Sequence, residues 1–303
     1  MRKSFKRNII LMAAVAAIAL PGAAQAHRQW MLPSSTVLSG DDVWVTVDAA
    51  VSNDLFYFDH QPMRTESVKA IAPDGTEVKI ENASTGRYRS TFDVHLLQKG
   101  TYKIVSATNF VMGSYMLDGK ETRLPRGTTT ETLKTAIPAG ATDVKTSEAF
   151  NRNELFVTVG APTDTVLKPT GKGLEMVPVT HPNDLVAKET ATFQFLLDGK
   201  PAPDLKVTVV EGGIRYRGTP GQMDLKTDKD GKVAVTWPEA GMYWLNASIG
   251  GGREGGPPPA AGGAAPKPAA PKPAADAAPK PAAPAGPPAR RASYVTTLEV
   301  LAP

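Results

Sequence analysis

The stretch Asp41-Asp-Val-Trp-Val-Thr-Val-Asp-Ala-Ala50 decides the class of fold. Valines stand at every second position from Val43 to Val47, and this two-residue period predicts a β-strand with one buried face. Similar short segments, closed by turn residues, recur along the chain. Further strands are predicted at 55–58, 67–72, 77–81, 87–92, 100–108, 155–159, 174–179, 191–197, 205–211, 223–227, 231–237, 241–249 and 294–301. No segment of residues 27–303 shows a sustained helical period, so the sequence predicts an all-β protein.

The spacing of these strands predicts two domains. Short strands with turns every 8–12 residues are typical of immunoglobulin-like or transthyretin-like β-sandwiches. We therefore expect two tandem sandwiches, at 27–168 and 169–303, which suits a chain of 303 residues. Within the second sandwich, Asp228-Lys-Asp-Gly231 predicts a hairpin turn between the strands on either side.

Residues 250–292 interrupt the second sandwich. They hold 12 of the 27 prolines, in repeats such as Ala-Pro-Lys-Pro-Ala-Ala. Proline cannot donate to a β-ladder and favours an extended, solvated chain. Because a strand pattern resumes at Tyr294, we predict a disordered Pro/Ala-rich insertion in the last hairpin.

The N-terminus predicts export. Residues 2–7 are basic, residues 9–20 form an apolar run too short to span a bilayer, and Ala24-Gln-Ala26 fits a cleavage site. We expect a signal peptide at 1–26, cleaved after Ala26, and a protein of the periplasm that is not embedded in a membrane. The chain has no cysteine, which excludes disulfides and thiolate chemistry.

The charge distribution argues against nucleic acid as a partner. The formal net charge of +4 equals that of the four basic residues at 2–7. Residues 250–292 carry a further net +4, which leaves the folded remainder of the mature chain at −4. No basic face is therefore expected for phosphate backbones.

Cleavage after Ala26 would make His27 the mature N-terminus. Such a residue offers its α-amine and its ring nitrogen to one metal ion. Because an α-amine has a pKa of roughly 7.7–8, a metal ion can displace its proton near neutral pH. The alternative is that His27 has no role, because signal peptidase accepts many residues after the cut. The four histidines, His27, His60, His95 and His181, are the type of ligand expected for nickel, copper, cobalt or zinc.

Their spacing does not group these histidines, so we rank them by context. His60 ends the aromatic segment and is the best second ligand, with His95 or Asp59 as supplements. Each has a simpler reading: His60 as a rim residue, His95 as a solvent-exposed residue, and His181 as a turn residue bonded to the backbone. Met31 and Met63 could bias a site toward soft ions, although methionines in a sandwich usually fill the core.

The motifs of common enzymes are missing from the sequence. There is no Gly-x-Ser-x-Gly elbow, His-Glu-x-x-His pair, phosphate-binding loop or dinucleotide fingerprint. We therefore predict a protein that is not an enzyme.

Several motifs resemble a known family. They are His27-x-x-Trp-Met-Leu-Pro-Ser34, Gly171-Lys-Gly-Leu-Glu-Met-Val-Pro-Val-Thr-His-Pro-Asn-Asp-Leu185, Asp198-Gly-Lys-Pro201, Gly212-Gly-Ile-Arg-Tyr-Arg217 and Trp237-Pro-Glu-Ala-Gly-Met-Tyr-Trp244. The sequence is similar to periplasmic proteins of nickel/cobalt uptake systems, a domain family of unknown function. The resemblance covers 27–249 and 293–303 and implies an exported two-sandwich protein of transition-metal uptake.

From the residues and the resemblance together, we expect an accessory protein that captures a divalent transition ion through His27. Nickel or cobalt is the first expectation, with copper, zinc or iron also possible. The expected partner is an inner-membrane metal transporter or an outer-membrane receptor system; the oligomeric state stays open. Two other functions fit the sequence: a non-catalytic envelope or adhesion module, and a copper-dependent oxidative enzyme in which His27 and a second histidine form a three-nitrogen brace.

Overall fold

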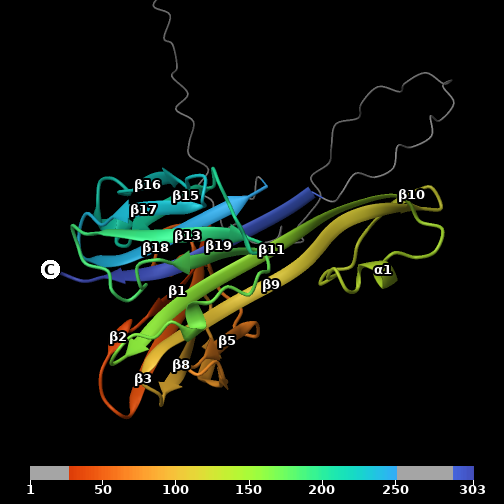
Figure 1. Cartoon of the computed structure of the whole chain (residues 1–303). Coiled ribbons are helices and arrows are strands. Elements are labelled where there is room, and N and C mark those ends of the chain that lie inside the picture. The colour runs from red at the N-terminus through yellow and green to blue at the C-terminus, as the bar shows by residue number, and fades with distance from the viewer. Residues whose placement is uncertain (1–26, 251–288) are drawn as a thin grey trace, which may run out of the picture.

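A computed structural model describes residues 27–250 and 289–303 (Figure 1). Within these residues nearly all of the regular secondary structure is β-strand, which confirms the predicted fold class. The predicted signal peptide, 1–26, and most of the predicted insertion, 251–288, lie outside the described residues. No helix of the described part is long and apolar enough to cross a membrane.

The strands form three sheets. The first has five strands, in the order β1 (Arg28–Pro33), β3 (Val43–Ser52), β8 (Ser90–Leu96) and β7 (Ile80–Thr85), with β4 (Gln61–Pro62) paired to β3. The second has ten, in the order β16 (Met223–Lys226), β15 (Lys206–Glu211), β18 (Gly241–Ile249), β19 (Ala289–Val300), β11 (Thr142–Val159), β9 (Gly100–Leu117), β5 (Val68–Ile71) and β6 (Glu77–Val78), with β10 (Lys120–Arg123) on β9 and β2 (Val37–Leu38) on β11. The third holds β12 (Leu174–Pro178), β13 (Thr190–Leu197) and β14 (Lys200–Pro201), with β17 (Lys232–Thr236) on β13. The short helices are α1 (Leu133–Ala136), η1 (Thr165–Leu167) and η2 (Ile214–Tyr216).

The ten-stranded sheet is shared by two sandwiches. One half of it packs against the five-stranded sheet around a core that includes Val45, Phe92 and Ile104. The other half packs against the four-stranded sheet around Phe193 and Trp237. The halves join where β11 and β19 pair in parallel over nine residues. The last strand therefore ties the C-terminal sandwich to the N-terminal one through backbone hydrogen bonds.

A third core fills the junction between the sandwiches. Trp30 of β1 and Leu55 pack there with Val210, Trp244 and Val295 from the ten-stranded sheet. The Trp30 Nε1–H donates to Ser52 Oγ at 2.7 Å, and the Trp244 Nε1–H donates to the Gln29 carbonyl at 3.0 Å. Strand β1 is thus fixed to both halves of the molecule.

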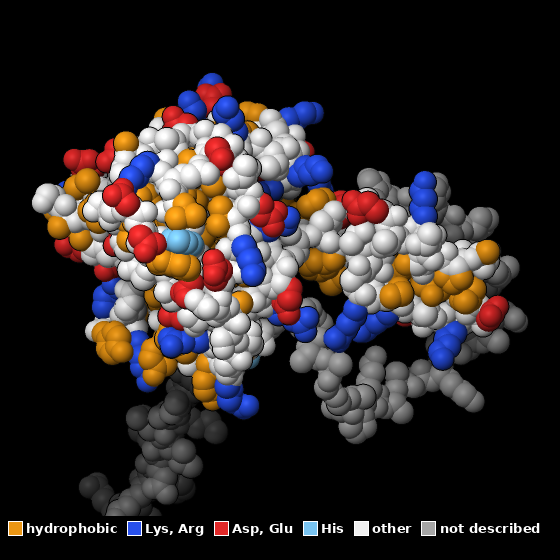
Figure 2. Space-filling view, turned by 90° about the horizontal axis from the view of Figure 1, so that it is seen from below, with side chains coloured by type: hydrophobic (Ala, Val, Ile, Leu, Met, Phe, Trp, Pro, Cys, Tyr) orange, Lys and Arg blue, Asp and Glu red, His pale blue; other side chains and the backbone are white. Residues whose placement is uncertain are grey.

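The strands β9 and β11, with 18 residues each, run past the sandwich as an arm (Figure 1). Strand β10 and α1 cover the arm around a small core of Val111, Tyr115 and Leu124. Gly113 is required there, because a Cβ atom would overlap the Lys145 carbonyl oxygen of the facing strand. Figure 2 shows an apolar patch on this arm, whereas acidic and basic side chains are interspersed over the sandwiches.

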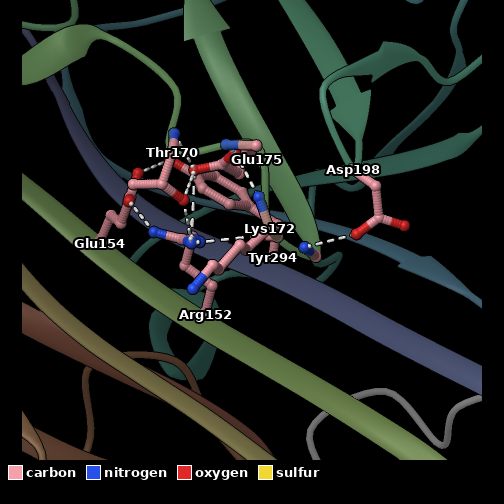
Figure 3. A network of polar contacts seen from close by, with 9 residues as sticks. Arg152, Glu154, Thr170, Lys172, Glu175, Asp198 and Tyr294 are labelled. Carbon is pink, nitrogen blue, oxygen red and sulfur yellow. Dashed lines mark hydrogen bonds and ion pairs between the residues drawn. The ribbon is translucent and has the colours of Figure 1, made fainter.

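A buried polar network joins β11, β12 and β19 (Figure 3). Arg152 lies 3.1 Å from Glu154 and 3.3 Å from Glu175, and these three side chains are 11, 5 and 5% exposed. The Tyr294 hydroxyl donates to the second Glu154 oxygen at 2.9 Å, and burial raises the pKa of this phenol well above its usual value. Glu175 also accepts hydrogen bonds from the backbone N–H groups of Thr170, Gly171 and Lys172. One cation therefore holds two buried carboxylates at the junction.

The structure corrects three sequence predictions. Residues 55–58 form no strand, because their aromatic side chains fill the junction core from a loop in which Phe56 has a φ of 60°. The turn at 228–231 closes no hairpin, since β16 pairs with β15 and β17 pairs with β13 in the other sheet. The predicted insertion also ends too late, because β19 begins at Ala289: Arg290 lies 4.7 Å over Phe150 and pairs with Asp198.

Candidate functional site

His27 and His60 lie on opposite sides of the end of β3. His27 stands one residue before β1, whose first residue Arg28 pairs with Ser52 of β3. His60 stands one residue before β4, whose first residue Gln61 pairs with Val51 of the same strand. Two histidines separated by 32 residues in sequence are therefore brought together by a single strand between them.

The two imidazole rings are stacked. Their centroids are 3.7 Å apart and their planes are 9° from parallel. Burial, and then the neighbouring His27 ring, lowers the pKa of His60, while Asp59 acts in the opposite direction. His60 is thereby favoured in its neutral form, which is the form that binds metals. Because the lone pairs lie in the ring planes, one ring must turn before both can bind the same ion.

The loop that carries His60 is ordered from within. Asp59 accepts hydrogen bonds from the backbone N–H groups of Asn53, at 2.9 Å, and Asp54, at 3.4 Å. Ser52, which receives the Trp30 hydrogen bond, donates to the Asp54 carbonyl at 2.6 Å. Both oxygens of Asp59 thus hold the loop closed, and the side chain fixes the position of His60 rather than supplying a free ligand.

Two imidazoles alone make an incomplete metal site. Within residues 27–250 and 289–303, no group of three or more His, Asp or Glu side chains is arranged to hold a metal ion. Cleavage before His27 would add its α-amine as a third nitrogen, on the same residue as one of the two imidazoles. A chain cleaved there would offer one amine and two neutral imidazoles, a donor set that fits a late first-row divalent ion.

His95 does not join the pair. It lies opposite Trp44 in β8, eight residues along β3 from Ser52, which corresponds to roughly 26 Å. Its ring stacks on Trp44, with centroids 4.0 Å apart, and its Nε2 lies 2.6 Å from an oxygen of Asp42. These contacts hold the His95 ring against Trp44 and Asp42, away from His27 and His60.

His181 also lies elsewhere, between the two sandwiches. Its Nδ1 accepts the Asn183 backbone N–H at 3.2 Å, and its Nε2 lies 3.0 Å from the Thr101 hydroxyl of β9. Burial lowers the pKa of this ring. Asn183 bonds in turn to Thr158 and to the Phe156 carbonyl of β11. The turn at His181 therefore fastens the C-terminal sandwich to the N-terminal one.

Two arginines contact the loop that leads to His60, and the sequence did not predict either of them there. The Arg215 guanidinium lies 4.1 Å over the Tyr57 ring, and that of Arg89 lies 4.4 Å over Phe58. Arg215 belongs to η2, which the Gly212–Arg217 motif forms. Gly212 has no room for a Cβ, because Phe56 packs against it. The motif therefore serves to seat an arginine beside the histidine loop, which spacing along the chain could not show.

Comparison with known proteins identifies the family. The profile described as "Domain of unknown function (DUF4198)" matches residues 24–251. The protein belongs to this DUF4198 family. No curated protein matches the chain significantly.

Solved structures similar to this DUF4198 protein include the D0–D1 domain of intimin, with 13% identity over 72% of this chain and 88% of that one, and a TM-score of 0.18. Human OSCAR ligand-binding domain matches with 10% identity over 74% and 90%, and a TM-score of 0.17. A DUF4785 family protein of Legionella pneumophila matches with 7% identity over 72% and 50%, and a TM-score of 0.22.

Proposed function

We propose that the mature protein captures a divalent transition-metal ion in the periplasm and passes it to an uptake system. The observation that carries the proposal is the pairing of His27 with His60, whose rings lie 3.7 Å apart at the predicted mature N-terminus. The α-amine of His27 completes a set of three nitrogen ligands. Nickel or cobalt is the proposed cargo, because the sequence resembles proteins of nickel/cobalt uptake.

The position of the site supports capture followed by release. Both histidines are partly exposed and stand at strand ends rather than inside a core. Three nitrogen donors leave coordination positions open, through which a receiving protein can take over the ion. The proposed partner is a membrane metal transporter or receptor.

The test uses protein exported without a tag and processed to His27. Calorimetric titration with Ni²⁺, Co²⁺, Cu²⁺, Zn²⁺ and Fe²⁺ should reveal one site. The site should be lost in His27→Ala, in His60→Ala and in a version that retains Ala26, since each removes one nitrogen ligand. His95→Ala is the matched control and should bind as the unaltered protein does.

Two results would overturn the proposal. One is equal affinity in the version that retains Ala26, since its amine is blocked by a peptide bond. The other is the lack of any site tighter than about 100 µM, roughly −5.5 kcal/mol. The latter outcome would favour a non-catalytic envelope module.

The same three nitrogens also suit a copper-dependent oxidative enzyme, and the stacking of His27 with His60 favours this second candidate equally. The two functions differ in whether the metal-loaded protein consumes oxygen. Copper-loaded protein that consumes oxygen only in the presence of a reductant, and no longer does so as His60→Ala, would establish the enzyme. Binding of the ion without oxygen consumption would support capture and delivery.

A further inference from the structure

The proposed metal site leaves the charge of the ion uncompensated. One amine and two neutral imidazoles carry no negative charge, so a divalent ion bound by them keeps its full double charge. The nearest carboxylate in sequence, Asp59, already accepts hydrogen bonds from two backbone N–H groups. The remaining coordination positions therefore favour anionic oxygen ligands from outside the protein.

The surroundings of the site favour the same kind of ligand. Arg215 and Arg89 lie with their guanidinium faces over the rings of Tyr57 and Phe58, in the loop that leads to His60. A ring contact occupies the face of a guanidinium and leaves its in-plane N–H groups, which match a carboxylate in bidentate geometry. Both side chains are 48% exposed, so their edges are accessible.

Neither arginine is committed to a strong ion pair. The shortest nitrogen–oxygen distance is 3.8 Å from Arg215 to Asp54 and 3.3 Å from Arg89 to Asp48. Pairs of this length whose arginine is about half exposed contribute little to stability. A carboxylate of an incoming ligand can therefore replace Asp54 or Asp48 at small cost.

Phe58 is two residues from His60, so their Cα atoms are at most about 7.6 Å apart. From these observations we infer that the cargo is a metal–carboxylate chelate: the ion binds His27 and His60, and carboxylates of its chelator bind Arg215 and Arg89. The inference rests on the proposed metal capture and adds the chemical class of the substrate.

Equilibrium dialysis of radiolabelled citrate, with and without Ni²⁺, tests this inference. The mature protein should retain citrate only when nickel is present. The double variant Arg89→Ala/Arg215→Ala should retain citrate about tenfold more weakly or worse, while its affinity for Ni²⁺ alone changes less than about threefold. The control Arg123→Ala/Arg126→Ala removes the same charge from the arm and should behave as the unaltered protein does. Arg215→Lys keeps the positive charge and loses the bidentate pair of N–H groups, so it should retain less citrate than the unaltered protein and more than the double variant.

The outcomes distinguish the two proposals. If the protein takes up nickel and leaves citrate in solution, or if the double variant retains citrate normally, the chelate inference is wrong and metal capture stands. An equal loss in the arm control would also refute it, because the effect would then be one of net charge. If the mature protein binds no nickel even without citrate, the metal site itself is refuted.

Discussion

Replacement of Arg152 by methionine should destabilise the protein strongly. Methionine keeps much of the apolar stem and removes the guanidinium that contacts both Glu154 and Glu175, whose side chains are each 5% exposed. Removing one partner of a buried ion pair typically costs 3–5 kcal/mol. Glu175 keeps its backbone N–H donors, whereas the donor that remains to Glu154 among the described residues is the Tyr294 hydroxyl. We therefore expect a loss near the lower end, about 3 kcal/mol, most of it from Glu154.

Urea unfolding followed by tryptophan fluorescence would measure this loss. For a chain of this size it corresponds to a decrease in Tm of about 6–12 °C. Lys69→Met is the matched control: it breaks the exposed pair with Glu77, whose side chains are 60 and 56% exposed, and should cost less than about 1 kcal/mol. The Arg152→Met defect should also shrink in Arg152→Met/Glu154→Gln. A loss below about 1 kcal/mol for Arg152→Met would refute the reasoning, because the carboxylates would then not depend on the guanidinium.

Three further changes test other parts of the fold. Burial lowers the pKa of His181, so the unfolded chain takes up a proton at a higher pH than the folded chain does, near the ordinary pKa of 6.5. The free energy of unfolding should therefore decrease as the pH falls from 8 to 5. Urea midpoints measured over this range should decrease less in His181→Gln. Trp30→Phe removes the 2.7 Å hydrogen bond to the buried Ser52 and should cost about 1–3 kcal/mol, measured by the same unfolding assay. Gly113→Ala should separate β9 from Lys145 in the arm and speed amide hydrogen exchange there, while exchange in the junction core stays unchanged. An equal change of the exchange rate in the arm and in the junction core would contradict this prediction.

The sequence was sufficient where a pattern is local. The alternating valines of β3 face the core as predicted, since a two-residue period has one buried face. The turn at 228–231 was recognised by its Asp and Gly, yet turn chemistry specifies a reversal and not the strand that follows. In a sandwich the chain can cross to the opposite sheet at such a turn, and here β17 does so.

The candidate site depended on information that is not local. The sequence favours His60 as the second ligand because it follows a predicted strand at 55–58, which the structure does not contain. The two histidines meet because β1 and β4 pair with the same end of β3, and β1 itself was not predicted. Arg215 reaches the site from the other sandwich, and no spacing rule within one chain segment could have placed it there.

A metal ligand at a chain terminus is useful only if the terminus is held, because ordering a frayed end would subtract from the binding free energy. Strand β1 meets this requirement: it pairs with β3 over six residues, and Trp30 and Trp244 anchor it in the junction core. Metal affinity and stability should therefore be coupled. An ion bound only by the folded chain stabilises it by about 2.7 kcal/mol at a free concentration of 100 times the Kd. Because the Trp30 hydrogen bond helps to hold β1 in place, Trp30→Phe should also weaken metal binding, although Trp30 lies inside the core and not among the proposed ligands. Unchanged affinity in that variant would mean that His27 is positioned without the help of the Trp30 hydrogen bond.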